Sequence, residues 1–436
     1  MTVAIDTRNA AVACVSGRDL RVPLVQGGTR TYANFDYAAS APALTQVTDR
    51  LAALLPYYAS VHRGAGYASR ISTDCYESAR GSVARFLNCA DDQVVVFTRN
   101  TTDALNLLAA CVPGDTVVLD IEHHANFLPW QRNGRRVVPV ADTIEETLDR
   151  IARELGTKPA ALLSVTGASN VTGEILPLDR LAALAHRFGT RIAVDAAQLA
   201  PHRRIDLRAC GIDYLALSGH KLYAPFGAGV LVGRRDWLDT AEPYLAGGGA
   251  VLAVSTDGVE WARAPQRHEA GSPNVLGVAA LAAACDTLGS LHEAEITVHE
   301  RYLTVRLREG LDSIPGVRFL RIWPDSTDGV GIVAFTVDGV EPGHVAAYLS
   351  AEHGIGVRDG RFCAHPLLHR LGVDGALRAS IGLGSRARDV DRLVAAVAAL
   401  VDRGTGWNYR QRDGQWSPAP ETRERLAPGS VTGASR

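Results

Sequence analysis

Short apolar runs alternate with amphipathic stretches from about residue 94 to residue 233, and few folds accommodate this alternation. The runs are rich in β-branched residues and lack polar alternation, which is typical of strands buried on both faces of a parallel sheet. Stretches of helical spacing separate them, and such strand–helix–strand units close with right-handed crossovers. We therefore predict an α/β fold whose seven-stranded, mostly parallel sheet is covered by helices, with strands at 94–97, 116–119, 137–140, 161–165, 192–194, 214–217 and 229–232.

A second pattern begins with an amphipathic stretch near residue 288 and continues as shorter strands and helices to about residue 401. This order predicts a smaller α+β domain packed on the first, with a cleft between the two. The predicted parts are an N-terminal arm, a large domain whose N-terminal part can also pack with the small domain, the small domain itself, and a C-terminal tail with little core. Their limits are 1–30, 31–286, 287–402 and 403–436.

The composition of the 436 residues narrows the kinds of partner. The 45 lysines and arginines nearly balance the 47 aspartates and glutamates, so no excess charge favours nucleic acid or an anionic membrane surface. The seven cysteines are scattered without Cys-x-x-Cys spacing, which indicates neither a disulfide framework nor a metal site. With no apolar run of membrane-spanning length, we expect a cytoplasmic protein that binds a small molecule.

Reactive side chains follow two of the predicted strands where these strands end. Lys221 closes the sequence Ser-Gly-His-Lys after the run 214–217, and Asp195 with Gln198 follows the run 192–194. In open parallel sheets, ligands bind at the carboxyl ends of the strands. A lysine and an aspartate there indicate a pyridoxal phosphate pocket, because this cofactor takes a Schiff-base lysine and an anion at its pyridine nitrogen. Taken alone, an exposed lysine and a helix-capping aspartate are plainer interpretations.

Seven motifs extend this interpretation over most of the chain. They lie at 100–106, 122–131, 169–173, 194–198, 218–221, 269–274 and 358–367. From about residue 31 to residue 402, the chain resembles the class V, fold-type I pyridoxal phosphate enzymes, and within them most closely the group II cysteine desulfurases and selenocysteine lyases. Each motif is weak alone, but their order along the chain is that of the family.

The resemblance implies a role for each residue around the cofactor ring. Lys221 would hold the cofactor as a Schiff base, Asp195 would keep its pyridine nitrogen protonated, and Gln198 would reach its phenolic oxygen. His123 would stack on the ring and help to move protons. Because an unperturbed lysine with a pKa of ~10.4 is almost wholly protonated at neutral pH, we expect burial and the charge of the ring to lower the pKa of Lys221.

A second group of residues would bind the cofactor phosphate. Thr101 and Thr102 open a predicted helix, whose N-terminal amides and positive dipole end favour an anion. Ser218 and His220 would complete this cradle, as the family pattern implies. Ser272 corresponds to a position that reaches the phosphate from the partner subunit, so the resemblance implies a homodimer with a shared active site.

A third group would bind and cleave an amino-acid substrate. Arg378 matches the arginine that holds the substrate α-carboxylate by two hydrogen bonds, and Asn170 resembles the asparagine near this carboxylate and the ring oxygen. Cys363 lies in the loop that the family places over the substrate, where an attacking thiol needs a nearby cation. The candidates for that cation are Arg358, which we also assign to substrate binding, Arg361 and His365.

The implied reaction is the desulfuration of cysteine, which yields alanine and a persulfide on Cys363 that a sulfur acceptor then collects. Two departures from the family pattern bear on it, since Arg361-Phe362 replaces histidines before the cysteine and residues 383–386 replace a Tyr-Asn-Thr-like segment. One alternative is a related carbon–sulfur lyase or aminotransferase acting on a specialised amino acid, for which Cys363 is not essential. A second is a non-catalytic pyridoxal phosphate-binding protein.

Overall fold

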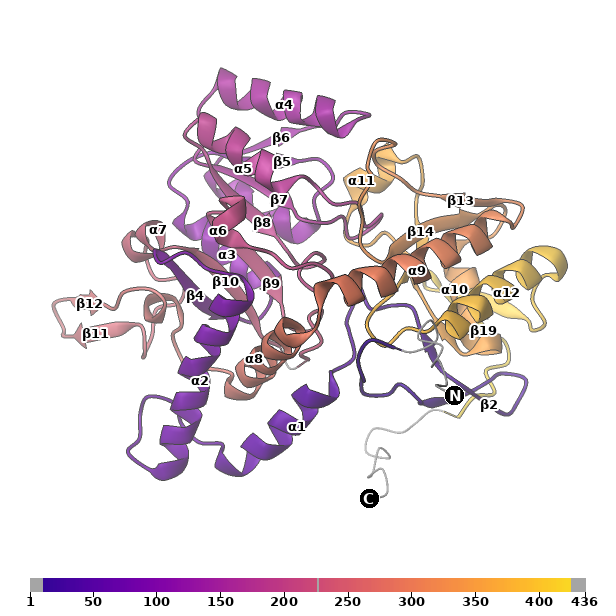
Figure 1. Ribbon diagram of the computed structural model, residues 1–436, viewed down its shortest axis with the longest axis horizontal. Helices are drawn as coiled ribbons and strands as arrows, with labels where there is room; N and C mark the ends of the chain where they lie inside the picture. The colour runs from indigo at the N-terminus through magenta and orange to yellow at the C-terminus, as the bar shows by residue number, and fades with distance from the viewer. Residues whose placement is uncertain (1–10, 226, 425–436) are drawn as a thin grey trace, which may run out of the picture.

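The computed structural model describes residues 11–225 and 227–424, and its central feature is a seven-stranded sheet (Figure 1). The strands follow the order β4-β10-β9-β8-β7-β5-β6. β10 pairs antiparallel with β4 and β9, and the other neighbouring pairs are parallel, so the predicted α/β fold with a mostly parallel sheet is confirmed. The strands are β4 (Gln93–Thr98), β5 (Thr116–Leu119), β6 (Arg135–Val138), β7 (Leu162–Thr166), β8 (Arg191–Asp195), β9 (Tyr214–Ser218) and β10 (Gly229–Arg234).

Helices cover both faces of this sheet because successive strand residues point to opposite sides. Leu162 belongs to an apolar cluster with residues of α3 and α7, whereas the next residue, Leu163, belongs to a cluster with residues of α2, α4, α5 and α8. Both faces are therefore apolar, which explains the continuous apolar runs in the sequence. The helices of this part are α1 (Thr45–Leu54), α2 (Tyr67–Phe86), α3 (Thr101–Cys111), α4 (Ile144–Thr157), α5 (Leu178–Arg187), α6 (Leu207–Cys210), α7 (Arg235–Thr240) and α8 (Val275–Ser290).

A second, antiparallel sheet of four strands has the order β13-β14-β17-β16. Its core is a separate cluster that joins Phe335 to leucines of α9, α10 and α12 and to Phe35 from the N-terminal part of the chain. Figure 1 shows α9 running from α8 to this sheet. The predicted domain limits stay predictions. The elements are β13 (Val317–Phe319), β14 (Ile332–Val337), β16 (Arg358–Gly360), β17 (Ala376–Ser380), α9 (Glu293–Asp312), α10 (Pro342–His353), α11 (His365–Arg370) and α12 (Ala387–Arg403).

Several two-stranded pairs lie outside these two sheets. β3 (Ala33–Asn34) runs parallel to β15 (Ile355–Gly356), which ties the N-terminal segment to the region of the second sheet. The antiparallel pairs are β1 (Arg21–Pro23) with β2 (Thr29–Thr31), and β11 (Val251–Val254) with β12 (Val259–Trp261). In the described part of the chain, no single helix is long and apolar enough to cross a membrane; α8 and α9 meet both conditions only as a pair, and they are bent by 90° relative to each other.

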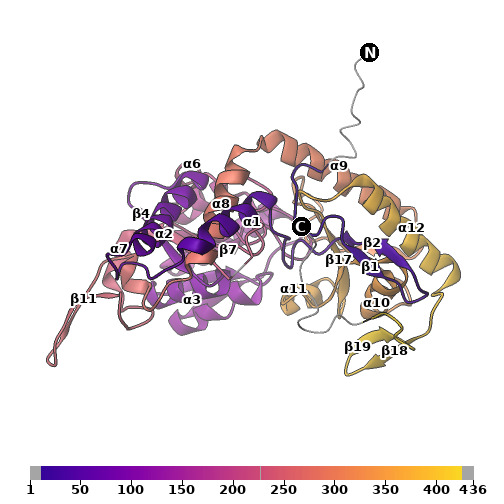
Figure 2. The ribbon, with the colours of Figure 1, turned by 90° about the horizontal axis from the view of Figure 1, so that it is seen from below.

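The C-terminal segment forms a hairpin where the sequence predicts a tail with little core. Strands β18 (Tyr409–Arg412) and β19 (Gln415–Pro418) pair antiparallel beside α10, as Figure 2 shows. The Trp416 indole stacks on His344 of α10 with ring centroids 4.4 Å apart. Glu352 accepts hydrogen bonds from the Tyr409 hydroxyl and from the backbone amides of Gly406 and Trp407, just before the hairpin. Residues 425–436 of the predicted tail and 1–10 of the predicted arm lie outside the described residues.

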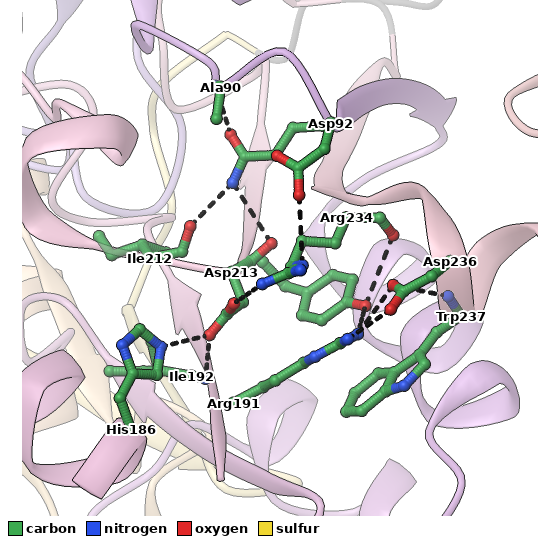
Figure 3. Close-up of polar contacts among 12 residues, drawn as sticks. Ala90, Asp92, His186, Arg191, Ile192, Ile212, Asp213, Arg234, Asp236 and Trp237 are labelled. Atoms are coloured by element: carbon green, nitrogen blue, oxygen red, sulfur yellow. Dashed lines mark hydrogen bonds and ion pairs between the residues drawn. The ribbon is translucent and has the colours of Figure 1, made fainter. Parts of the chain in front are cut away.

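A polar cluster closes the amino-terminal edge of the seven-stranded sheet (Figure 3). The buried Asp213 carboxylate accepts a hydrogen bond from the Ile192 amide at 2.9 Å and lies 2.8 Å from His186 Nε2. Arg234 Nη1 donates to the same carboxylate at 3.4 Å. Ile192 is the second residue of β8, Asp213 directly precedes β9, and Arg234 ends β10. This one side chain therefore joins three neighbouring strands at a single edge.

Candidate active site

A cavity of about 640 Å³ lies at the opposite, carboxyl edge of the sheet, where segments of the second sheet also reach it. All the predicted site residues except Ser272 line this cavity. They are Thr101, Thr102, His123, Asn170, Asp195, Gln198, Ser218, His220, Lys221, Arg358, Cys363 and Arg378. The structure thus brings together residues from strand ends of the large sheet and from the loops and strands of the small one.

Lys221 and Asp195 face the cavity from neighbouring parallel strands. Asp195 is the last residue of β8 and is 4% exposed, and Lys221 follows the end of β9. Burial lowers the pKa of Lys221 to about 8, although the Asp195 carboxylate opposes this shift. Burial also raises the pKa of Asp195, and its Oδ1 accepts a hydrogen bond from the Ala197 amide at 3.0 Å. A substantial fraction of Lys221 is therefore neutral near physiological pH, as the sequence predicts.

Gln198 presents an unpaired oxygen at this edge. Its Nε2 donates to the Ala38 carbonyl at 2.7 Å, and this contact fixes which end of the amide is nitrogen. Its Oε1 is buried and has no hydrogen-bond partner among the described residues. Because a buried acceptor without a partner is costly, a ligand in the cavity that offers a donor here would be stabilised.

The N-terminus of α3 lies beside these strand ends. The Asn100 side chain caps this helix by accepting from the Asp103 amide at 3.0 Å. Ser218 Oγ accepts from the Thr101 amide at 2.8 Å and lies 2.8 Å from Thr101 Oγ1. The Thr101 amide, which the sequence predicts as an anion donor, is therefore engaged by Ser218. Thr101, Thr102 and Ser218 all line the cavity at the positive end of the helix.

His123 enters the cavity as a neutral imidazole. Its Nδ1 accepts a hydrogen bond from the Ala125 amide at 3.0 Å, so the neutral ring carries its proton on Nε2. Burial, together with the nearby Lys221 charge, lowers the pKa of His123 to about 4. The neutral ring can therefore donate a hydrogen bond from Nε2.

Arg378 is held in the cavity wall by groups from three segments of the chain. It is 4% exposed; its Nη1 donates to the Asn170 carbonyl at 2.8 Å, and its Nη2 donates to Asp36 Oδ1 at 3.3 Å. The guanidinium carbon lies 5.3 Å from the centre of the Phe362 ring. The side-chain amide of Asn170 donates to the Phe362 carbonyl at 2.8 Å, so one loop orients both the arginine and the cysteine loop.

Cys363 lies exposed in the loop between β16 and α11 and lines the same cavity. Its carbonyl accepts from the His124 amide at 2.9 Å. Of the predicted cationic neighbours, Arg358 lines the cavity. By contrast, Arg361 donates to the Asp374 carbonyl at 3.2 Å, and the His365 ring packs edge-on against His124 with centroids 4.6 Å apart.

Ser272 lies outside this cavity, in a second hollow of about 370 Å³ that Arg63 and Glu269 also line. Its role toward a partner subunit stays a prediction. Two residues near the chemistry were missed from the sequence. Asp36 pairs with Arg378, and Phe362 covers the guanidinium. The only sequence signal for Asp36 is its place before a run of small residues, 38–41, where a backbone can approach closely.

The site has a lysine and a buried aspartate at adjacent strand ends of an open α/β sheet, beside the N-terminus of a helix that favours anions. This arrangement defines the fold-type I class, whose members depend on pyridoxal phosphate. Residues 33–393 match the family described as aminotransferase class-V, and the chain belongs to this family. The predicted resemblance is confirmed.

Within this family, the chain is similar to several cysteine desulfurases. The chain is 38% identical over 380 residues to a cysteine desulfurase of Dickeya dadantii, covering 84% of this chain and 91% of that protein. It is 38% identical over 355 residues to the cysteine desulfurase CsdA of Escherichia coli, covering 79% and 87%. The crystal structure of CsdA superposes with a TM-score of 0.76 at 36% identity, covering 85% of this chain and 95% of that one. The apo cysteine desulfurase of Thermococcus onnurineus NA1 gives 0.79 at 34% identity, with the same coverage of 85% and 95%.

Proposed function

We propose that the chain is a pyridoxal phosphate-dependent cysteine desulfurase, which cleaves the carbon–sulfur bond of L-cysteine to give L-alanine and a persulfide on Cys363. One observation carries this proposal: Cys363 lines the same cavity as Lys221, Asp195 and Arg378. The lysine, the aspartate and the arginine suit many amino-acid reactions of this cofactor class. A thiol added to them suits the removal of sulfur in particular.

The lining of the cavity fits pyridoxal phosphate. Asp195 suits the pyridine nitrogen, and the unpaired Gln198 Oε1 suits a phenolic hydroxyl group, which can donate to it. The Ser218 and Thr101 hydroxyls, with Thr102 and His220, suit the phosphate. Lys221 would hold the cofactor covalently, and His123 would face its ring. When bound, the cofactor supplies an electron sink that stabilises negative charge at the substrate α-carbon.

The chain's own residues would then divide the work of the reaction. Arg378 would bind the substrate α-carboxylate near Asn170 and Arg358. The neutral amine of Lys221, free once the substrate amine has taken its place, would take the α-proton. The Cys363 thiolate would form a bond to the substrate sulfur while the carbon–sulfur bond breaks toward carbon. Lys221 would return one proton to carbon, and the proton that the substrate thiol loses, exchanged through His123, would supply the second and complete alanine. The sulfur left on Cys363 would pass to an acceptor thiol.

We propose a homodimer in which Ser272 reaches the partner's phosphate site, since Ser272 lies away from its own cavity. The proposed sequence limits are those given above: an arm to residue 30, a large domain to 286, a small domain to 402 and a tail. The proposed location is the cytoplasm. A protein sulfur acceptor would reach Cys363, whose exposure supports such a transfer.

The test compares Cys363→Ser with Cys14→Ser, since both cysteines are exposed and only Cys363 lines the cavity. We expect wild type and C14S to release equal amounts of alanine and sulfide from cysteine with a reductant present, and C363S to release neither. Continued turnover of cysteine, selenocysteine or a cysteine conjugate by C363S would instead identify a lyase or aminotransferase. A purified protein that is colourless and traps no cofactor with borohydride would contradict the enzyme proposal.

A further inference from the structure

Asp36 touches the substrate-binding arginine from a segment far away in the sequence. Its Oδ1 accepts from Arg378 Nη2 at 3.3 Å, and its side chain is 29% exposed, whereas that of Arg378 is 4% exposed. Burial raises the pKa of Asp36, and the Arg378 charge opposes this shift. Asp36 therefore supplies a carboxylate to a guanidinium group that is otherwise withdrawn from water.

The nitrogens of Arg378 are not equally occupied. Nη1 donates to the Asn170 carbonyl and Nη2 to Asp36, while Nε is buried with no partner among the described residues. Nε and Nη2 form one edge of the planar group, and a carboxylate binds such an edge by two parallel hydrogen bonds. The two existing contacts hold the plane and leave Nε, on this edge, without an acceptor among the described residues.

The backbone around Asp36 is anchored to the strand that carries the arginine. Asp36 lies opposite Ser380 in an isolated parallel bridge. The Ser380 amide donates to the Phe35 carbonyl at 2.7 Å, and Ser380 Oγ accepts from the Ala38 amide at 2.9 Å. Because Arg378 and Ser380 are two residues apart on β17, they point to the same side of the strand.

The same short segment reaches the other side of the cavity. The Ala38 carbonyl accepts from Gln198 Nε2 at 2.7 Å, and Ala38 itself lines the cavity. Residues 35–38 therefore bridge β17, which carries Arg378, and the strand end that carries Gln198. A displacement of Asp36 would therefore move groups at both the proposed substrate site and the proposed cofactor site.

We infer that Asp36 is a positioning residue, whose carboxylate fixes the plane of the Arg378 guanidinium so that its Nε and Nη2 edge receives the substrate α-carboxylate. This inference rests on the proposed function, from which it takes the amino-acid substrate. Asp36 itself does not touch the reacting atoms. Its removal should weaken the recognition of the carboxylate more than it slows the chemical step.

The experiment measures binding by the cofactor-loaded protein of two ligand pairs that differ only in the carboxylate: L-alanine against ethylamine, and L-cysteine against cysteamine. The variants are Asp36→Asn, which keeps the shape, Asp36→Glu, which keeps the charge, and the control Asp49→Asn on an exposed face of α1. We expect D36N to raise the Kd of L-alanine about tenfold, equivalent to ~1.4 kcal/mol. The Kd of ethylamine should stay unchanged, D36E should recover most of the loss, and D49N should match wild type.

Steady-state kinetics with L-cysteine provide a second measurement. D36N should raise KM about tenfold and lower kcat by less than threefold, since the chemistry uses other groups. The same substitution in an Arg378→Lys background should add little, because the group that Asp36 positions is then absent. If D36N does not fold, Asp36→Ser takes its place with the same expectations.

The outcomes separate this inference from the proposed function. Equal loss of affinity for alanine and ethylamine in D36N would indicate a general structural role and overturn the inference, as would unchanged binding of both. Wild-type protein that does not distinguish alanine from ethylamine would also overturn it. Wild-type protein that does distinguish them, but releases no sulfide from cysteine, would contradict only the desulfurase proposal.

Discussion

The side-chain amide of Asn170 donates a hydrogen bond of 2.8 Å to the backbone carbonyl of Phe362, the residue that precedes Cys363. Phe362 and Cys363 have φ angles of 51° and 53°, in the left-handed region that is costly for residues other than glycine. Two successive residues in this region need support from their surroundings. Asn170 and the His124 amide, which donates to the Cys363 carbonyl, provide it.

Asn170→Ala should therefore loosen the cysteine loop. Loss of one hydrogen bond, worth about 0.5–1.5 kcal/mol, should speed amide hydrogen exchange in residues 361–365 by up to about tenfold. Exchange measured by mass spectrometry checks this. The control Asn106→Ala also removes a side-chain bond of 2.8 Å to a backbone carbonyl, on α3. Equal exchange of the loop in N170A and N106A would contradict the role of Asn170.

The pKa of Lys221, lowered by burial to about 8, predicts how cofactor-free protein captures pyridoxal phosphate. At pH 7 about a tenth of the side chain is neutral, against fewer than about one in a thousand for an ordinary lysine. The capture rate should rise with pH and level off above a midpoint near 8. In Asp195→Asn, the carboxylate that raises this pKa is absent, so the midpoint should fall. Absorbance after mixing measures the rate, and a wild-type midpoint above 9.5 would contradict the prediction.

The raised pKa of Glu122 should make the stability of the folded protein depend on pH. Glu122 is fully buried, and its carboxyl accepts from Asn126 Nδ2 at 2.7 Å and from the Thr166 amide at 3.1 Å. Burial raises its pKa well above the usual range despite these hydrogen bonds. The folded state therefore binds this proton more tightly than the unfolded state does. Its contribution to stability is full below the unfolded pKa of ~4.3 and is lost as pH rises through the folded pKa.

Glu122→Gln stays neutral at every pH, so its unfolding midpoint in urea, relative to wild type, should rise as pH increases from 5 to 8. The exposed Glu242→Gln should show no such trend. Parallel pH profiles for wild type and E122Q would mean that Glu122 is ionised in the folded protein throughout this range.

The C-terminal hairpin should stabilise α10 without taking part in catalysis. The Trp416 indole stacks on His344 and donates to Glu341 Oε2 at 3.1 Å, and none of the described hairpin residues lines the active-site cavity. Trp416→Ala should lower the free energy of unfolding by about 1–3 kcal/mol and leave kcat unchanged. The exposed Arg410→Ala is the control. A large fall in kcat for W416A at a temperature where it is folded would show that the hairpin also contributes to catalysis and would contradict the prediction.

Much of the site could be predicted because it lies at strand ends. Lys221 and Asp195 follow apolar runs in the sequence, and the carboxyl ends of parallel strands meet at one edge of a sheet. Cys363 and Arg378 required the family resemblance, since no local pattern brings either to that edge. The reversed direction of β10 was open to inference, because the ten residues between β9 and β10 leave no room for a crossover helix.

Other features depend on contacts that periodicity does not encode. The pair Asp36–Arg378 joins residues 342 positions apart. The amide of Gln198 is oriented by the Ala38 carbonyl, and Arg361 donates to the Asp374 carbonyl and does not line the cavity. The hairpin at 409–418 has few apolar residues, and it is ordered by aromatic and carboxylate contacts with α10 rather than by a core of its own.

The Asp213 cluster has a consequence for how this chain can evolve. One buried carboxylate links β8, β9 and β10 by hydrogen bonds at their amino-terminal edge. The residues at the opposite edge therefore do not have to provide this link between the strands. There the chain can tolerate groups that work against stability, such as a buried lysine and the unpaired Gln198 oxygen. Substitutions around the cavity can then alter the reaction while the framework persists, and a change of chemistry does not require a new fold.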